Sequence, residues 1–289
     1  MKGQIIKAVA SRYTVLTEDK KLYICHIRGK VKRDMNIYVG DYVKIKPLED
    51  EKAIIEKIYP RKNALIRPFV SNMDNLIIVV APVPKPDWLL VDKLIVSCYI
   101  ENIRPTLCFH KADLISREEI KHLTKPYEGV IRLVQTSIKD KSIGLKELYE
   151  VMQGGLSCFT GQSAVGKSSI INEILGKEVM EVCDVSPKAQ RGKNTTRHIE
   201  IFDWGGGRVT DTCGFSLLEL EELPPQELTY YYDEYMKLMP ECRFTDCVHI
   251  NEPECAVKKA VEEGSLSKER YLRYISIYNE LKEKQDEKY

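Results

Sequence analysis

The sequence predicts a multidomain protein in which a small β-barrel, a central α/β domain and a mostly helical C-terminal domain follow one another along 289 residues. Three observations support this division. Residues 1–65 contain five short runs with strand-like alternation, residues 66–217 alternate apolar strand-like runs with helix-like runs, and residues 218–289 are largely helix-like and carry a cluster of cysteine and histidine. A chain of this length can form two domains and a small third one.

The N-terminal segment favours a closed barrel. Its strand-like runs are GQIIKAV, RYTVLT, LYICHIRG, DYVKIKPL and AIIEKIY, and five such short strands suit the oligonucleotide-binding barrel, or OB-fold. The segment holds fifteen lysines or arginines against eight aspartates or glutamates, a local charge of +7, which indicates a polyanionic partner. The basic run from Arg28 to Arg33 is expected on a loop, as either a solvated turn or a contact for that partner.

The composition and the first residues of the sequence indicate the cellular compartment. The sequence has no run of about 18 apolar residues, so it predicts no membrane span. Its first residues lack the apolar block and cleavage site of a secretory signal, and we therefore expect a cytoplasmic protein. Nine cysteines are present, and those that lie singly are expected to be buried small side chains: Cys25, Cys98, Cys108 and Cys158.

The central domain is predicted to contain a parallel sheet covered on both faces. The run DNLIIVVAPV at 74–83 is almost entirely apolar, which is typical of a strand buried on both sides. Strand-like and helix-like runs then alternate as far as RVTDT at 208–212. The stretch PRKNALIRP at 60–68, with proline at both ends, is expected to be a linker between the barrel and this domain.

A phosphate-binding loop is the strongest single motif. Residues 161–168 fit the pattern G-x-x-x-x-G-K-S, and an apolar strand-like run precedes them while a helix-like run follows. In such a loop the backbone N–H groups surround phosphates, Lys167 neutralises the β- and γ-phosphate oxygens, and the Ser168 hydroxyl binds Mg²⁺. A structural glycine-rich turn is the alternative. The predicted binding residues are Gly161, Gln162, Ser163, Ala164, Val165, Gly166, Lys167, Ser168 and Ser169.

Two further stretches suit the γ-phosphate and its metal. The motif Asp211-Thr-Cys-Gly214 follows a strand-like run, so Asp211 would hold Mg²⁺ through water and the Gly214 N–H would meet the γ-phosphate; an ordinary turn is the alternative. Between the two motifs, RGKNTTRHIE at 191–200 offers Thr196 or Thr195 as a second Mg²⁺ ligand that orders when the γ-phosphate is present. For this stretch the alternative is a surface loop.

A base-reading loop is predicted ahead of the phosphate loop. In FHKADL at 109–114, Asp113 can accept hydrogen bonds from guanine N1–H and the 2-amino group, and the Lys111 stem can lie over the ring. A companion loop at 136–148 would bring the backbone of Ser137 and Ile138 to the guanine carbonyl. By themselves these four letters, HKAD, match by chance more often than not. Their place after a strand favours base recognition.

The order of these motifs is rotated relative to the usual GTPase order. The base loop and companion loop come first, and the phosphate loop, the threonines and the Asp211 motif follow. Joining the old termini of a sheet and opening a new gap leaves a site intact in space, because the termini of a domain often lie close together. The sequence therefore predicts a circularly permuted GTPase domain.

A metal cluster is predicted near the C-terminus. Three thiolates and one imidazole within fourteen residues suit a closed, structural, tetrahedral zinc site. Free buried cysteines are the alternative, whereas a catalytic zinc is disfavoured because all four positions are filled by the protein. The predicted ligands are Cys242, Cys247, His249 and Cys255.

Together these motifs resemble the RsgA (YjeQ/YloQ) family, the circularly permuted GTPases that depend on the small ribosomal subunit. The resemblance covers nearly the full chain. It implies a cytoplasmic factor that binds the 30S subunit and its rRNA late in assembly and hydrolyses GTP slowly until the subunit stimulates it. It also implies Mg²⁺ with GTP or GDP and one structural Zn²⁺, and we expect a monomer without membrane contact. The groups we assign to catalysis are Lys167, Thr196 and Asn194.

The chain departs from the family pattern at three positions. The base loop begins with His110 instead of asparagine, so nucleotide affinity is expected to change, while Asp113 should preserve the preference for guanine. Asn194 stands where the family often has histidine, and it can orient water but cannot act as a general base. Cys213 replaces a proline. Phe215 matches the family and implies that help with positioning water comes from elsewhere, such as the ribosome.

Other classes of function compete with this interpretation. A nucleotide-gated RNA-binding module with little hydrolysis is the main alternative, and His110, Asn194 and Phe215 support it. Asp113 argues against an ATPase. A DNA-binding zinc protein is disfavoured, since one closed cluster beside an acidic helix is a poor reader of the major groove.

Overall fold

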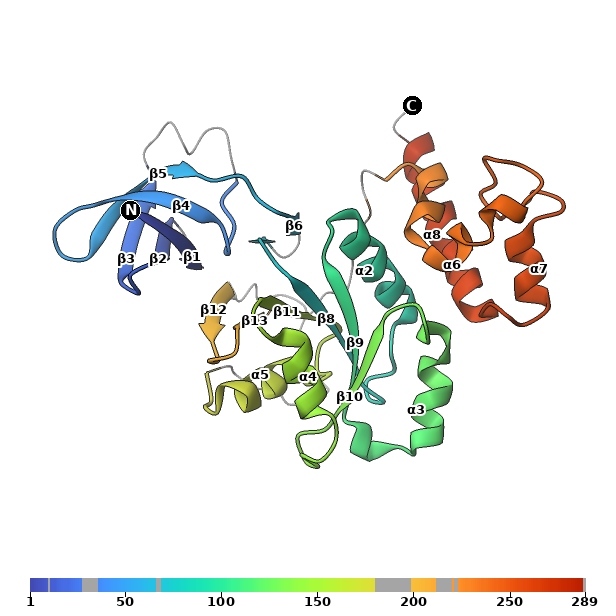
Figure 1. Cartoon of the computed structure of the whole chain (residues 1–289), viewed down its shortest axis with the longest axis horizontal. Coiled ribbons are helices and arrows are strands. Elements are labelled where there is room, and N and C mark those ends of the chain that lie inside the picture. Colours follow the sequence, from blue (N-terminus) through green and yellow to red (C-terminus); the bar gives the residue numbers. More distant parts are fainter. Residues whose placement is uncertain are drawn as a thin grey trace.

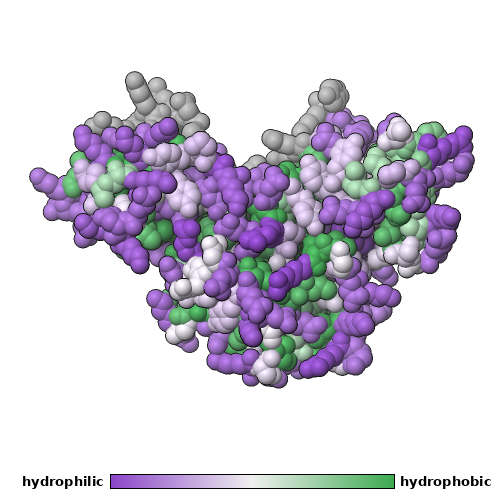
Figure 2. Space-filling view, in the orientation of Figure 1, coloured by the Kyte–Doolittle hydropathy of each residue, from purple (hydrophilic) through white to green (hydrophobic). Residues whose placement is uncertain are grey.

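The computed structural model describes residues 1–9, 11–27, 36–65, 69–179, 199–211, 220 and 223–287. A barrel, a central α/β domain and a helical C-terminal domain form three bodies, with the barrel and the C-terminal domain on opposite sides of the central one (Figure 1). Hydrophilic residues cover most of the face in Figure 2, and hydrophobic residues show mainly over the central domain. In the described part of the chain, no helix combines the length and apolar character needed to cross a membrane.

The barrel contains the five strands that the sequence predicted. The strand order is β1-β2-β3-β5-β4, and β4 also pairs with β1, which closes the barrel; β3 and β5 are parallel. Inward-facing side chains of all five strands, among them Ile5, Val15 and Ile55, are fully buried. The strands are β1 (Lys2–Val9), β2 (Arg12–Thr17), β3 (Leu22–Ile27), β4 (Tyr42–Pro47) and β5 (Lys52–Ile58).

The stretch expected to be a linker is tied down in its described part. Strand β6 (Ala64–Leu65) pairs with β7 (Val70–Ser71). The carboxylate of Asp41, which has no exposed surface, accepts hydrogen bonds from Arg61 Nε at 2.7 Å and from Ser71 Oγ at 2.7 Å. These hydrogen bonds join the barrel to the following segment. Breaking either one would leave the buried carboxylate short of a hydrogen-bond partner, which costs free energy.

The central domain is a sheet covered on both faces, as predicted. Its strand order is β10-β9-β8-β11-β13-β12, in which the first five strands are parallel and β12 is antiparallel to β13. The strands are β8 (Asn75–Val80), β9 (Arg104–His110), β10 (Arg132–Thr136), β11 (Leu156–Thr160), β12 (Ile199–Asp203) and β13 (Arg208–Asp211). All six residues of β8 are buried, as expected for the middle of such a sheet.

Alternation along β8 explains the two layers of helices. Leu76, Ile78 and Val80 belong to a core cluster with helices α2 (Trp88–Ile100) and α3 (Arg117–Thr124). Ile77 and Val79 belong to a second cluster with helices α4 (Leu145–Met152) and α5 (Lys167–Leu175). Successive side chains of a strand point to opposite faces, so one apolar strand serves both cores. A short 3-10 helix, η1 (Ala112–Leu114), follows β9, and another, η2 (Lys125–Tyr127), follows α3.

The barrel and the central domain share one continuous sheet. Strand β12 pairs antiparallel with β1, with Lys7 opposite Glu200 and Ala8 opposite Ile199, so eleven strands form a single ladder. The partly buried side chains of Ile6 and Ala8 pack against the core cluster that contains Ile201. The barrel is therefore attached through both hydrogen bonds and apolar packing.

The C-terminal domain is helical and packs on α2. Val96 of α2 belongs to the same core cluster as Tyr232, Tyr274 and Ile277. Beside this core, the fully buried carboxylate of Asp92 accepts hydrogen bonds from two arginines of α8, Arg270 and Arg273. The elements are η3 (Pro225–Tyr231), α6 (Asp233–Met236), η4 (Met239–Glu241), α7 (Ala256–Glu262) and α8 (Lys268–Asp286).

Candidate functional site

The predicted site residues converge because their strands are parallel. The base loop follows β9, the companion loop follows β10, the phosphate loop follows β11, and Asp211 ends β13. In the ladder, Thr136 of β10 lies beside His110 of β9, and Asp211 lies beside Phe159 of β11. Carboxyl ends of parallel strands meet at one edge of a sheet, which is where ligands bind in open α/β folds. Segments in rotated chain order thus lie side by side.

The phosphate loop wraps around the ammonium group of Lys167. Lys167 is 7% exposed, and its Nζ donates to the carbonyl oxygens of Gly161 at 3.0 Å and Gln162 at 2.8 Å. Gly161 has φ of 134°, and a Cβ at that position would lie 2.2 Å from the carbonyl oxygen of Val79, so glycine is required there. Helix α5 begins at Lys167, and its first N–H groups face the loop as an anion-binding end.

A serine of this loop meets the carboxylate that ends β13. Ser168 Oγ donates to Asp211 Oδ2 at 3.1 Å. A hydroxyl and a carboxylate are oxygen ligands of the kind that Mg²⁺ prefers, either directly or through water. The two residues that the sequence assigned to Mg²⁺ within the described chain are therefore neighbours.

Lys111 joins the base loop to the phosphate loop. Its Nζ donates to the carbonyl oxygen of Ala164 at 2.8 Å and to that of Val83 at 2.9 Å. Burial and the nearby charge of Lys139 lower the pKa of Lys111. Lys111 and Ala164 both have left-handed backbones, with φ of 56° and 63°, a conformation that costs free energy in residues other than glycine.

His110 makes a second contact between the same loops. Its ring is 3% exposed, and Nδ1 lies 3.0 Å from the hydroxyl oxygen of Thr136. A Cβ added to Gly166 would lie 2.5 Å from His110 Cδ2, so the ring packs directly on the phosphate loop. Burial, followed by the charge of Lys111, lowers the pKa of His110 to about 4. The histidine at this position is therefore a neutral packing residue.

Asp113 stands at the mouth of the site. Its Oδ1 accepts a hydrogen bond from Ser137 Oγ at 2.6 Å, and the Ser137 oxygen in turn accepts one from the backbone N–H of Asp140 at 3.0 Å. The bond from Ser137 is the main reason that the pKa of Asp113 is lowered. Ser137 is fully buried while Asp113 is exposed, so the companion loop holds an ionised carboxylate where a ligand can reach it.

Some predicted residues lie elsewhere or outside the described chain. Val165 is fully buried in the core under α5, Ser163 is exposed, and Ser169 lies in the first turn of α5. The basic run 28–33 lies outside the described residues, as do the following positions: Asn194, Thr195, Thr196, Cys213, Gly214 and Phe215.

Sequence reasoning missed the segment between β8 and α2. Gln162 Oε1 accepts a hydrogen bond from the backbone N–H of Asp87 at 2.9 Å, and the carbonyl oxygen of Val83 accepts one from Lys111 Nζ. This segment therefore contacts both the phosphate loop and the base loop. Its position at the carboxyl end of the central apolar strand was the available signal, because every such loop reaches the same edge of the sheet.

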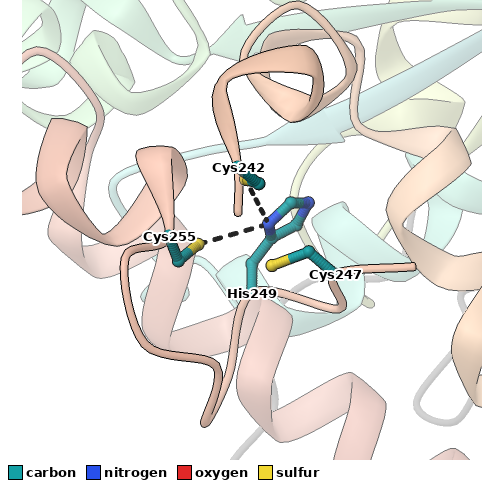
Figure 3. Close-up of side chains that lie close together, drawn as sticks. All are labelled: Cys242, Cys247, His249 and Cys255. Carbon is teal, nitrogen blue, oxygen red and sulfur yellow. Dashed lines mark hydrogen bonds between the residues drawn. The ribbon is translucent and has the colours of Figure 1, made fainter. Parts of the chain in front are cut away.

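The cysteine and histidine cluster forms a compact set of metal ligands. The ligand atoms of Cys242, Cys247, His249 and Cys255 all lie within 4.8 Å of one another, and in Figure 3 the four side chains converge. His249 Nδ1 lies 3.4 Å from the sulfur of Cys255 and 3.7 Å from that of Cys242. Three sulfurs and one nitrogen at this spacing fit a tetrahedral ion. The cluster can thus hold a metal.

Residues around the cluster hold the ligand His249 in place. His249 Nε2 lies 3.0 Å from Thr229 Oγ1, which leaves Nδ1 to face the sulfurs. Tyr271 donates to the carbonyl oxygen of His249 at 2.7 Å. Burial raises the pKa of Cys247 to about 12, whereas a bound cation would favour the thiolate. Thr229 is a supporting residue that the sequence did not reveal, because it lies twenty positions away from its partner.

Comparisons with known proteins agree with this geometry. Two family models match, the RsgA N-terminal domain over residues 2–55 and the RsgA GTPase over residues 58–221. The small ribosomal subunit biogenesis GTPase RsgA of Caldanaerobacter subterraneus subsp. tengcongensis is 38% identical over 294 aligned residues, which cover 100% of this chain and 98% of the relative. That of Clostridium acetobutylicum is 40% identical over 286 residues, which cover 97% and 98%.

Two solved structures are also similar over nearly their full length. The crystal structure of YjeQ from Thermotoga maritima superposes with a TM-score of 0.80 at 32% identity, covering 97% of this chain and 98% of that one. YloQ, a circularly permuted GTPase, superposes with a TM-score of 0.78 at 34% identity, covering 98% and 95%. The rotated motif order predicted from the sequence is therefore confirmed.

Proposed function

The chain belongs to the RsgA GTPase family, and we propose that it hydrolyses GTP as a factor in the late maturation of the small (30S) ribosomal subunit. One observation carries the proposal for the site. The ammonium group of Lys111 in the base loop donates to Ala164 in the phosphate loop, so the two halves of a guanine nucleotide would bind to loops that contact each other. Two curated relatives that cover 100% and 97% of this chain are named small ribosomal subunit biogenesis GTPases.

We assign base recognition to the loops after β9 and β10. Asp113 would accept hydrogen bonds from guanine N1–H and the 2-amino group, and its lowered pKa keeps it ionised for that purpose. Adenine presents an acceptor at N1 and lacks the 2-amino group, so the same carboxylate would reject it. Lys111 would lie along the ring, the backbone of Ser137 and Ile138 would serve the guanine carbonyl, and His110 would hold the base loop in place.

We assign phosphate binding and hydrolysis to the loops after β11 and β13. Lys167 would stabilise the negative charge that develops on the β- and γ-phosphate oxygens, together with the backbone N–H groups of residues 161–169. Ser168 and Thr196 would bind Mg²⁺ directly, and Asp211 would do so through water; when bound, the ion would neutralise phosphate charge. Gly214 would donate its N–H to the γ-phosphate, and Asn194 would orient the attacking water. Contact between Ser168 and Asp211 supports this arrangement.

We propose that the other two domains serve RNA binding and structure. The barrel, residues 1–65, would bind rRNA through its excess of basic residues, and the GTPase domain would comprise residues 66–217. Residues 218–289 would hold one Zn²⁺ ion on Cys242, Cys247, His249 and Cys255, with a structural role because the protein supplies all four ligands. The protein would act as a monomer in the cytoplasm.

Hydrolysis with and without the partner tests the proposal. Single-turnover GTP hydrolysis would be measured with the protein alone and with purified small ribosomal subunits, for the parent and for Asn194→His. We expect the subunits to accelerate the parent at least about tenfold, equivalent to about 1.4 kcal/mol of transition-state stabilisation. If subunits bind in a nucleotide-dependent way but accelerate neither protein, the chain is a nucleotide-gated RNA-binding module instead. If subunits neither bind nor accelerate, the ribosomal role is refuted.

A further inference from the structure

Strand β13 connects the barrel to the proposed magnesium site within four residues. At its start, Arg208 Nη1 donates a hydrogen bond to the side-chain oxygen of Gln4 in barrel strand β1. At its end, Asp211 accepts the hydrogen bond from Ser168 of the phosphate loop at 3.1 Å. Three residue steps of a strand span about 10 Å, so a single short strand touches both sites.

The barrel end of this connection is firmly held. Gln4 is 4% exposed, and its side-chain nitrogen donates to the carbonyl oxygen of Gly40 at 2.9 Å. Asn72 donates to the same carbonyl oxygen at 3.0 Å. Gly40 packs so closely that a Cβ there would lie 2.1 Å from the carbonyl oxygen of Ser71. A shift of the barrel would therefore move the partner of Arg208.

The strand is buried and fully paired between its two ends. Val209 and Thr210 are fully buried, and β13 pairs along its whole length with β11, from Arg208 beside Leu156 to Asp211 beside Phe159. Close-packed interiors transmit displacement because their side chains have no free volume to absorb it. A displacement of Arg208 would thus also displace Asp211.

The neighbouring strand β12 keeps β1 aligned with β13. It lies between them in the sheet, pairs with both, and carries Glu200, whose carboxylate accepts a hydrogen bond from Lys7 of β1 at 2.5 Å. This ion pair is about one-third exposed, so it contributes less to the connection than the buried Gln4.

We propose that Arg208 is a positioning residue through which engagement of the barrel with polyanionic RNA adjusts Asp211 and Ser168 and so accelerates GTP hydrolysis. The inference rests on the proposed function, because it requires that a small subunit bind the barrel and stimulate turnover. Arg208 touches neither the nucleotide nor the RNA in this scheme. Coupling between two binding sites is reciprocal, so the same contact makes the affinity for the subunit depend on the nucleotide.

The test separates stimulation from folding and from binding. Arg208→Gln and Arg132→Gln would each be compared with the parent in single-turnover GTP hydrolysis, without and with saturating small ribosomal subunits. Arg132 is the matched control, since it is an exposed arginine on β10 at the opposite edge of the central sheet. We expect Arg208→Gln to keep its unstimulated rate within about twofold of the parent. Its stimulated rate should fall about five- to tenfold, which is the lower part of the typical range for coupling between two sites. Arg132→Gln should match the parent.

Two further measurements make each outcome decisive. Gln4→Leu removes the same hydrogen bond from the barrel side, and the double variant should lose no more stimulation than either single one. Subunit affinity with a non-hydrolysable GTP analogue and with GDP should differ less in Arg208→Gln than in the parent. If small subunits stimulate the parent, Arg208→Gln and Gln4→Leu to the same extent, the inference is overturned while the proposed function stands. A parent without stimulation refutes the proposed function and this inference with it.

Discussion

The imidazole ring of His110 lies directly on Gly166, so the first residue of the base loop touches the last glycine of the phosphate loop. A Cβ at Gly166 would come within 2.5 Å of His110 Cδ2, and the backbone there has φ of 105°. The ring is fixed from its other side by the Thr136 hydroxyl at 3.0 Å. In this chain, packing of the His110 ring on Gly166 keeps the two loops in contact.

Gly166→Ala should therefore abolish tight nucleotide binding. The new methyl group collides with the ring, and the left-handed backbone is strained for alanine. We expect GDP affinity to fall by at least about a hundredfold, which corresponds to about 2.8 kcal/mol. Adding His110→Ala to Gly166→Ala removes the collision and should recover part of the loss. Fluorescent GDP titration measures both, and equal affinity of the single and double variants would contradict the steric account.

The neutral state of His110 predicts a pH dependence of stability. Burial lowers its pKa from 6.5 to about 4, so the unfolded chain takes up a proton near pH 6.5 while the folded chain does not until about pH 4. The contribution of His110 to the free energy of unfolding is thus complete above pH 6.5. It is lost as the pH falls to 4, by about 3 kcal/mol in all. His110→Asn should flatten this part of the profile.

Tryptophan fluorescence can follow that profile. Both tryptophans, Trp88 and Trp204, lie in the central domain, so their emission during urea unfolding reports on that domain. His122→Asn is the control, because it replaces an exposed histidine of α3 in the same domain by the same residue. Parallel profiles for His110→Asn and the parent between pH 6.5 and 4 would show that folding does not lower the pKa of His110.

Asp113→Asn should change which base is bound. The carboxylate would make two charge-assisted hydrogen bonds to guanine, each contributing about 1.5 kcal/mol or more, so GDP affinity is expected to fall about a hundredfold. An asparagine amide can donate to the C2 carbonyl of xanthine, so binding of xanthosine diphosphate should improve. Asp140→Asn, in the adjacent companion loop, should leave both affinities unchanged. Competition binding decides, and an unaltered GDP affinity in Asp113→Asn would remove Asp113 from the base site.

Sequence periodicity was sufficient for the architecture. The alternating runs of the first 65 residues became β1 to β5, and the apolar run at 74–83 became the central strand β8. Each of these patterns reports the local environment of a strand, which is why it can be read without knowing the fold. The motif order likewise predicted the permutation, because parallel strands bring their carboxyl ends to one edge whatever their order along the chain.

Contacts between distant segments could not be predicted in the same way. The pairing of β12 with β1 joins residues about 190 positions apart, with Lys7 opposite Glu200, and no periodicity specifies which strand edge finds which. The hydrogen bonds of Asp41 with Arg61 and Ser71, and the contact of Asp87 with Gln162, depend on tertiary positions as well. Asp92 offered one signal, since it is the single carboxylate in a mostly apolar helix and therefore needs a partner where that helix is buried.

The metal cluster should depend on its supporting threonine. Thr229 Oγ1 lies 3.0 Å from His249 Nε2 and so fixes the ring with Nδ1 toward the sulfurs. Removal of such a supporting hydrogen bond typically lowers metal affinity about ten- to a hundredfold, and Thr229→Val should do so for Zn²⁺. Thr124→Val is the control, because Thr124 is also buried and its hydroxyl donates to the helix carbonyl oxygen of Ile120. Competition with a chromophoric chelator gives both affinities; equal values would place Thr229 outside the site.

The buried ion cluster between α2 and α8 should hold the C-terminal domain in place. Asp92 has no exposed surface and accepts hydrogen bonds from both Arg270 and Arg273, so Asp92→Asn leaves two desolvated arginines short of a negative charge. Breaking a buried pair in this way costs about 3–5 kcal/mol, whereas an exposed pair contributes about 0–1 kcal/mol.

Glu280→Gln is the matched control, since the Lys93–Glu280 pair also joins α2 to α8 but is partly exposed. Hydrogen exchange of the α8 amides should accelerate about a hundredfold or more in Asp92→Asn and by less than about tenfold in Glu280→Gln. Similar acceleration in both variants would mean that apolar packing around Val96, rather than the ion cluster, sets the strength of this contact.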